Sequence, residues 1–480
     1  MMRSLSSADN FVKEAMKKRG DNYYPKFHIA AQYGWVNDPN GLIYINGKYH
    51  FFFQHYPYKP IWGPMHWGHV VSDDMVHWEH MPIALYPDQE YDRDGCYSGS
   101  AVNNNGILTL FYTGHRFFKK TGEDSRIFQV QCMATSIDGI HFTKHGPVLY
   151  SPEGIVDFRD PKVWRAREKW WMVVGAKVND LGQVRLYQSD NLKEWQFRCI
   201  LHQAKDSVDG YMWECPDFFS VNNKDVLITS PQGMPAQEYD YRNLHQSGYC
   251  IGQWEKNGTF SIETSFREID HGHDFYAPQT FEAADGRRIM VGWMEMWDAP
   301  LPNQSEGWSG ALTLPREVSC NEIGKLYCKP IVELELLRTD YKKFELIALN
   351  NEVYSLDETY QELKLSIDLT ASSGRCYGLH IESAGRIIVD SALKRLIFER
   401  HSSDYELQSC RSISLKGMLR IDLHIFIDAS SIEIFVNEGE YSLTSKIYPI
   451  SDQKKLTLFA EKGTAIFKNI EEWKLDSIFK

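Results

Sequence analysis

Apolar and polar positions alternate along most of the chain from residue 28 onward, and clusters of turn residues interrupt the alternation at short intervals. Three stretches show this plan clearly: "GLIYINGKYHFFFQ", "GSAVNNNGILTLFYTG" and "DFFSVNNKDVLITSPQG". Period-two alternation is typical of half-buried strands, and pairs such as Asn46-Gly47 are typical of hairpin turns. The same rule predicts a hairpin turn at Asn40-Gly41, followed by a strand. The pattern therefore predicts a chain built mainly from antiparallel strands.

A second motif recurs between these hairpins and sets a Ser six residues before an aromatic residue. It occurs as "SDDMVHW" (72–78), "SIDGIHF" (136–142) and "SDNLKEW" (189–195), each of which predicts a strand, a tight turn and a strand. The spacing of the copies is about that of a four-stranded blade, which favours a β-propeller. Roughly five such units would fill the chain up to about residue 325. An open sandwich with coincidental hairpins is the alternative.

The pattern changes after "KLYCKPIVELELLR", where Val332 to Leu337 predicts a short helix or linker. The later stretches, such as "LRIDLHIFIDASSIEIFVNEGEYSLTSKIYP", alternate with period two, and Asn437-Glu438-Gly439 predicts a hairpin turn. This pattern is typical of a β-sandwich, for which a stabilising or accessory role is expected. Near the start of the chain, Phe11, Val12, Ala15 and Met16 fall at helical spacing and predict a short amphipathic helix.

The predicted fold class is therefore all-β, a five-bladed β-propeller followed by a C-terminal β-sandwich. The expected divisions are an N-terminal extension with a short helix (1–27), a propeller catalytic domain (28–328), a linker (329–340) and a sandwich domain (341–480).

Composition narrows the classes of partner and compartment. The net charge of −12, from 64 acidic and 52 basic residues, argues against nucleic acid or an anionic membrane surface as partner. The nine cysteines are odd in number and form no C-x-x-C pair, so neither a disulfide framework nor a zinc site is expected. Neither a signal-peptide h-region nor a membrane-spanning stretch is evident, and we expect a cytoplasmic protein. The 14% aromatic content fits an all-β core or a sugar-binding cleft.

Three polar motifs stand at the beginnings of predicted units: "WVNDPNG" with Asp38, "FRDPKVW" with Arg159 and Asp160, and "YMWECPDFF" with Glu214. The first strand of each propeller blade lines the central channel, so these carboxylates should converge there. Asp-Pro is also a common turn start, and Arg159 beside Asp160 could be a plain ion pair. Glu214 between Trp213 and Cys215 is expected to have a raised pKa, as a general acid should. One ionised and one protonated carboxyl group are the requirement of glycoside hydrolysis.

These motifs, together with "YSGSA", "FYAPQTF" and "IDASSIEIFVNEGE", resemble those of glycoside hydrolase family 32 along nearly the whole chain. The family comprises invertases, β-fructofuranosidases and sucrose-6-phosphate hydrolases, and the resemblance is strongest to the bacterial intracellular sucrose hydrolases. It implies that Asp38 is the nucleophile, Asp160 the transition-state stabiliser and Glu214 the acid/base. It further implies hydrolysis of sucrose with retention at the fructose anomeric carbon, and no metal or cofactor. The implied substrate contacts are Asn37, Gln54, Trp62, Tyr97, Ser98, Arg159 and Trp293.

Within the family the substrate is the open question: sucrose, sucrose 6-phosphate or a longer fructan. Members that hydrolyse the phosphorylated sugar carry a Lys where this chain has Met65, so we expect a preference for unphosphorylated sucrose. His66 could supply a partial positive charge, and Arg116, Lys119 or Lys120 could reach the same subsite. A fructan-binding lectin on the same scaffold and an arabinose-directed furanosidase of another five-bladed family also compete with this interpretation. A monomer and a homodimer both remain open.

Overall fold

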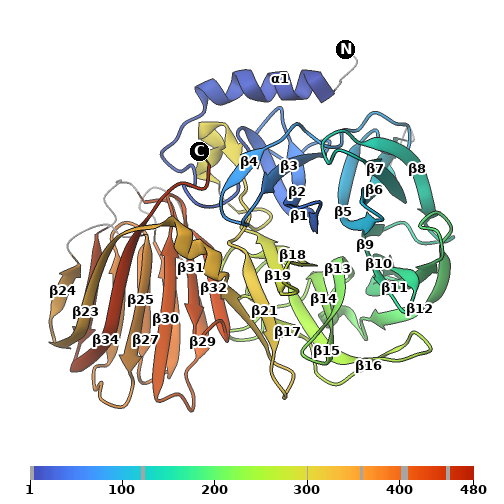
Figure 1. Ribbon diagram of the computed structural model, residues 1–480. Helices are drawn as coiled ribbons and strands as arrows, with labels where there is room; N and C mark the ends of the chain where they lie inside the picture. Colours follow the sequence, from blue (N-terminus) through green and yellow to red (C-terminus); the bar gives the residue numbers. More distant parts are fainter. Residues whose placement is uncertain are drawn as a thin grey trace.

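The computed structural model describes residues 5–119, 125–299, 301–356, 361–401, 409–449 and 455–479. Five small sheets stand in a ring, and two six-stranded sheets form a second body beside it (Figure 1). The sequence prediction of a five-bladed propeller followed by a sandwich is confirmed.

The blades follow one another along the chain, and the first strands of neighbouring blades contact each other around the channel. Their strands are, for blade 1, β1 (Gly34–Ile45), β2 (Lys48–Tyr56), β3 (His66–Ser72) and β4 (Trp78–His80); for blade 2, β5 (Gly95–Asn104), β6 (Ile107–Lys119), β7 (Ser125–Ser136) and β8 (Thr143–Tyr150); for blade 3, β9 (Phe158–Ala166), β10 (Lys169–Val178), β11 (Leu181–Ser189) and β12 (Gln196–Gln203); for blade 4, β13 (Met212–Val221), β14 (Lys224–Gln232), β15 (Gly248–Trp254), β16 (Phe260–Ile262) and β17 (Arg267–Glu268); for blade 5, β18 (Tyr276–Glu282), β19 (Arg288–Trp293), β21 (Arg316–Cys320) and β22 (Leu326–Pro330).

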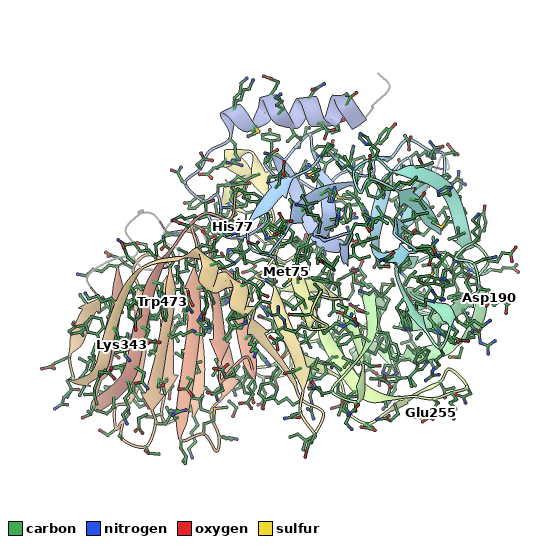
Figure 2. All side chains as sticks on the ribbon, in the orientation of Figure 1. Met75, His77, Asp190, Glu255, Lys343 and Trp473 are labelled. Atoms are coloured by element: carbon green, nitrogen blue, oxygen red, sulfur yellow. The ribbon has the colours of Figure 1, made fainter. Side chains whose placement is uncertain are left out.

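The recurrent Ser–aromatic motif forms the turn between the third and fourth strands of blades 1, 2 and 3. Asp74 Oδ1 accepts hydrogen bonds from the backbone N–H groups two and three residues further on, at 2.9 and 2.8 Å. Asp138 and Asn191 make the same pair of bonds in the other two copies. This side-chain capping explains why the motif repeats. Figure 2 labels Met75 and His77 in the first copy and Asp190 in the third.

The ring closes through strand β20 (Trp308–Ser309), which lies between β19 and β21 in the chain but pairs with blade 1. Gly34 pairs with Trp308 and Trp35 with Ser309 in a parallel ladder. The segment that carries the predicted nucleophile is therefore bounded by a strand more than half the chain away.

The sandwich consists of two antiparallel sheets that share one apolar core. One sheet has the order β23 (Arg338–Asn350), β34 (Thr464–Leu475), β25 (Glu362–Asp368), β30 (Arg420–Ile427), β31 (Ser431–Val436), β32 (Tyr441–Lys446); the other has the order β24 (Val353–Leu356), β33 (Leu456–Glu461), β26 (Cys376–Ile381), β27 (Gly385–Asp390), β28 (Arg395–Arg400), β29 (Ser409–Ser414). The predicted turn at Asn437 to Gly439 joins β31 to β32, and the predicted short helix is a 3₁₀ helix, η4 (Val332–Leu337). Three further 3₁₀ turns are η1 (Met16–Lys18), η2 (Ser207–Asp209) and η3 (Pro302–Glu306).

Buried charges join the two bodies. Arg316 of blade 5 has a fully buried side chain and binds Asp270 at 2.9 Å and Glu433 of the sandwich at 2.5 Å. His28 lies between Asp428 and Glu433, with its two ring nitrogens 2.7 and 2.9 Å from their carboxylates, and these contacts raise the pKa of the imidazole against the effect of burial. Buried ions of this kind are tolerated only when each is paired.

The N-terminal segment forms helix α1 (Leu5–Ala15), as the sequence predicts, and the helix lies across the outside of the propeller beside blade 1 (Figure 1). Asp9 accepts a hydrogen bond from the Ile83 N–H at 2.9 Å, and the Phe11 and Tyr58 rings lie 5.2 Å apart. No helix among the described residues is long and apolar enough to cross a membrane. All nine cysteines lie in the described ranges, and all are free thiols.

Candidate active site

The first strand of every blade carries a β-bulge close to the channel. In β1, Asn37 and Asp38 together oppose Gln54, so two inner residues face one partner residue. The same arrangement places an X-Pro pair on the bulge of β9, β13 and β18, and residue 98 on that of β5. A bulge bends the strand and re-aims its side chains, which is how residues of different blades reach one cavity.

The prediction of a hairpin turn at Asn40-Gly41 is wrong. Both residues lie inside β1 at a second register shift, and Asn40 accepts a hydrogen bond from the Gly99 N–H of the neighbouring blade at 3.2 Å. Gly41 has a φ of +53°, and a Cβ there would meet the Phe52 ring at 2.8 Å. The turn-forming pair supplies the positive φ of a bulge instead of a hairpin.

The bulges surround a cavity of about 350 Å³. It is lined by the three predicted carboxylates and by six of the seven predicted substrate contacts: Asn37, Asp38, Gln54, Trp62, Tyr97, Ser98, Arg159, Asp160 and Glu214. The other lining residues are Met65, His115, Phe117, Ile127, Gln129, Asp157, Gln232, His245 and Trp297. The predicted residues thus come from four blades and meet in one pocket, although they are far apart in sequence.

Asp38 is held in one orientation by its neighbours. Ser98 Oγ donates to Asp38 Oδ2 at 2.5 Å, and Asn37 Nδ2 donates to Asp38 Oδ1 at 3.1 Å. Trp35 lies outside the cavity lining, and its indole N–H donates to Asn37 Oδ1 at 2.8 Å and so orients the amide. Burial, followed by the charge of Glu214, raises the pKa of Asp38. An oriented and poorly hydrated carboxylate is suited to nucleophilic attack.

Glu214 has polar surroundings, in contrast to the apolar ones that its sequence neighbours suggested. Arg159 Nε donates to Glu214 Oε1 at 3.0 Å, and the second oxygen accepts from Gln232 at 2.9 Å and from the Tyr276 hydroxyl at 2.6 Å. Trp213 packs in an apolar cluster instead, and the Cys215 thiol lies beside Asp38 and Asp160. Donors on three blades therefore determine where this carboxylate stands.

Asp160 is the most deeply buried of the three carboxylates. Its Oδ2 accepts from the Cys215 N–H at 3.0 Å, and the Cys215 thiol lies 3.6 Å from the same oxygen and 3.4 Å from Asp38 Oδ2. Burial and the charge of Glu214 raise the pKa of Asp160 to about 7. Arg159 does not pair with Asp160; its guanidinium binds Asp157 at 2.7 Å and Glu214 at 3.0 Å.

Trp293 is the predicted contact that the structure does not bring to the cavity. Its side chain is fully buried, and its ring packs at 4.9 Å against Trp297 and at 5.8 Å against Trp35. Trp297, four residues later, supplies the aromatic wall instead. The order of aromatic residues in "GWMEMWDAP" carries no signal that distinguishes the two.

Several lining residues were not predicted. His115 stacks on Tyr97 with ring centroids 4.1 Å apart, and Gln129 accepts from the Phe158 N–H at 2.7 Å, which holds the start of β9. His66, which the sequence singled out, is buried outside the lining and contacts the Pro64 carbonyl. The motif "FYTG" directly precedes His115 and is the one signal that could have found it.

The residues that could hold a cation lie apart from the cavity. Among the described residues, Asp240, Glu268 and His271 form one group whose ligand atoms lie within 4.8 Å of one another. The group lies outside the cavity, and Glu268 already accepts from the Tyr241 N–H at 2.9 Å. It is therefore separate from the carboxylates that line the cavity.

Comparison with known proteins identifies the family of this chain. The model for the glycosyl hydrolases family 32 N-terminal domain matches residues 28–330, and that for the glycosyl hydrolases family 32 C terminal matches residues 333–474. The chain therefore belongs to glycosyl hydrolase family 32 and is a glycosidase of the β-fructofuranosidase type, as its sequence motifs predicted.

Relatives of this chain match it along nearly its whole length. A sucrose-6-phosphate hydrolase from Escherichia coli is 48% identical over 474 residues, covering 98% of this chain and 99% of that protein. A raffinose invertase from Escherichia coli is 47% identical over 479 residues, covering 99% and 100%. The solved structure of a mutant β-fructofuranosidase from Bombyx mori in complex with sucrose is 32% identical, with a TM-score of 0.86 and coverage of 99% and 98%.

Proposed function

We propose that this protein is a retaining β-fructofuranosidase that hydrolyses sucrose to glucose and fructose in the cytoplasm, where its nine free thiols would stay reduced. The observation that carries the proposal is the meeting of Asp38, Asp160 and Glu214 in one cavity, each on or directly beside the bulge of a different blade.

The reaction proceeds by two displacements at the fructose anomeric carbon. Asp38, oriented by Ser98 and Asn37, attacks this carbon and forms a covalent fructosyl-enzyme. Glu214 gives its proton to the glucosyl oxygen as the C–O bond breaks, and then takes a proton from the water that hydrolyses the ester. Asp160 stabilises, in its ionised form, the positive charge that develops on the ring.

The test of the proposal is the configuration of the first product. Proton NMR during hydrolysis of sucrose should show the β-anomer of fructofuranose first, before mutarotation, as two successive inversions require. Retaining glycosidases hold the two carboxyl groups about 5–5.5 Å apart, whereas inverting enzymes leave roughly 6.5–9.5 Å for a water. First formation of the α-anomer, or binding of sucrose without turnover as in a lectin, would refute the proposal.

Asp160→Asn should reduce kcat much more than it changes KM. The charge of Asp160 matters most when positive charge develops, so its loss weakens transition-state binding more than ground-state binding. Steady-state kinetics with sucrose should show a kcat loss of at least about 10²-fold. A change in KM alone would mean that Asp160 only binds the resting sugar.

The same substitution should stabilise the unliganded protein above neutral pH. An Asp whose pKa is raised to about 7 in the folded state holds its proton there while the unfolded chain has lost it, so stability falls as pH rises from about 4 to 7. Asp160→Asn removes this dependence. The difference in thermal midpoint between variant and parent should be near zero at about pH 4 and positive at about pH 8; a constant difference would contradict the raised pKa.

We further propose that sucrose is preferred over sucrose 6-phosphate. Met65 lines the cavity and offers no charge to a phosphate, while Arg159, the one Arg or Lys among the described lining residues, is bound to Asp157 and Glu214. Arg116 is outside the lining and pairs with Glu90 at 2.6 Å. Lys120 lies outside the described residues, as does the side chain of Lys119.

The kinetic expectation is a higher kcat/KM for sucrose than for sucrose 6-phosphate at neutral pH. The substitution Met65→Lys should shift this ratio toward the phosphorylated sugar, because an ammonium group beside the leaving-group subsite can bind phosphate. The name of the 48%-identical relative favours the opposite order. A kcat/KM for sucrose 6-phosphate about tenfold above that for sucrose, worth about 1.4 kcal/mol, would establish that order instead.

A further inference from the structure

A short segment of the propeller lies along the edge of the sandwich. Residues 270–274 connect β17 to β18, and β32 is an edge strand of its sheet. The His271 N–H donates to the Ser442 carbonyl at 2.8 Å, and the Asp274 N–H donates to the Thr444 carbonyl at 3.0 Å. The segment therefore covers the unpaired edge of the sandwich in the manner of an added strand.

Side chains fasten the segment at both ends. Asp270 accepts from the Thr444 N–H at 2.8 Å and from the Thr444 hydroxyl at 2.7 Å, while Arg316 binds its second oxygen. Asp274 accepts from the Lys446 N–H and from Arg400, both at 2.8 Å. These two aspartates and Thr444 are buried, so the bonds are shielded from water.

The fit leaves the segment little room to shift. A Cβ built on Gly272 would lie 2.0 Å from the Thr444 carbonyl oxygen, so the two backbones touch here. Phe275 is the next residue after the fastened segment. The guanidinium carbon of Arg316 lies 4.9 Å from the centre of the Phe275 ring and 5.0 Å from the centre of the Phe435 ring of the sandwich. The sandwich thus determines where β18 begins.

The first residue of β18 is Tyr276, which contacts Glu214 from outside the cavity. Its side chain is buried outside the cavity lining, and its hydroxyl oxygen lies 2.6 Å from Glu214 Oε2. Burial and the neighbouring Glu214 raise the pKa of the phenol well above its usual value, so the group keeps its proton and donates it. Tyr276 is the donor that blade 5 contributes to this carboxylate.

We propose that the β-sandwich positions the general acid/base: strand β32 holds residues 270–274, these hold Tyr276, and Tyr276 orients Glu214. The inference rests on the proposed function, since it assigns Glu214 the role of proton donor. Asp270 and Thr444 are then positioning residues that act through Tyr276. A carboxyl group that must first give and then take a proton at one place is sensitive to small displacements, and a misplacement of about 1 Å can cost about 10²-fold in rate.

The test compares two substrates whose leaving groups need acid assistance to different degrees. Sucrose expels an alkoxide and depends on protonation, whereas 4-nitrophenyl β-D-fructofuranoside expels a stabilised phenolate. Thr444→Val removes the hydroxyl while keeping the shape and the backbone bonds. It should lower kcat/KM for sucrose by about tenfold and leave the aryl substrate nearly unchanged. Tyr276→Phe should show the same selectivity.

A double-variant cycle tests the path itself. If Thr444 acts through Tyr276, the Thr444→Val substitution should add no further loss when Tyr276→Phe is already present. Ser430→Ala is the matched control: Ser430 Oγ is another buried hydroxyl, which donates to the Tyr23 carbonyl at 2.7 Å and accepts from Lys446 Nζ at 3.2 Å. It makes no hydrogen bond to residues 270–274. This variant should leave both substrates unaffected.

Equal losses on both substrates, no loss, or additive effects in the cycle would overturn the inference. If Thr444→Val does not fold, Asp270→Asn makes the same comparison. Failure of the proposed function would look different: the parent protein would not hydrolyse sucrose, or Glu214→Ala would keep its activity.

Discussion

Asp38→Ala and Glu214→Ala should each reduce kcat for sucrose by about 10³-fold or more. The first variant lacks the atom that bonds to the anomeric carbon. The second lacks both the acid of the first step and the base of the second. Neither side chain is part of an apolar core cluster, so circular dichroism and the thermal midpoint should stay close to those of the parent. Activity within about tenfold of the parent would refute the assignment.

Addition of azide distinguishes the loss of the acid/base from the loss of the nucleophile. Azide attacks the fructosyl-enzyme without needing a general base, so it should restore turnover of an aryl fructofuranoside by Glu214→Ala and yield the fructosyl azide of retained configuration. Asp38→Ala forms no such intermediate and should give no retained product. The same product from both variants would mean that the roles of the two carboxylates are wrongly assigned.

Arg316→Met should lower the free energy of unfolding by about 3–5 kcal/mol. The substitution keeps most of the side-chain volume but removes the charge between Asp270 and Glu433, and all three side chains are fully buried. Two carboxylates would then remain buried without their shared cation. The midpoint of urea denaturation, followed by tryptophan fluorescence, should fall accordingly.

The control for this variant is Arg287→Met. Arg287 pairs with three carboxylates, Asp285, Glu317 and Glu333, but its side chain is 22% exposed and that of Asp285 is 52% exposed. Exposed ion pairs contribute about 0–1 kcal/mol, so its midpoint should change little. Similar losses for both substitutions would mean that burial does not increase the contribution of the Arg316 ion pairs to the free energy of unfolding.

Local chemistry was enough to predict much of the fold. Asn46-Gly47, with φ of +51° and +83°, forms the expected hairpin turn, because the strands directly before and after it pair with each other. Asn40-Gly41 has the same turn chemistry but lies in an inner strand, where pairing with β2 continues through a bulge. Only the neighbouring blade, which supplies the Gly99 N–H to Asn40, determines that outcome.

Some residues of the candidate site could likewise be predicted from the sequence, and others could not. The three carboxylates could be predicted because a blade repeat places the beginnings of its units together. The identity of the aromatic wall, Trp297 and not Trp293, depends on which of two nearby indoles the packing buries. Tyr276 could not be found at all, since its contact with Glu214 arises from the placement of blade 5 against blade 4.

The closure of blade 1 has a consequence for how the protein is synthesised. Its strand β1 pairs with Trp308 and Ser309, and the Trp78 N–H of β4 donates to the Ile478 carbonyl at 2.9 Å. At about 5–20 residues per second, a ribosome needs roughly 20–90 s to deliver the last of these residues after the first strand has emerged. The strand carrying Asp38 keeps an open edge until β20 arrives, and β4 lacks this partner until residue 478 has been made. Nascent chains released before Ile478 has been added should therefore be inactive and prone to aggregation.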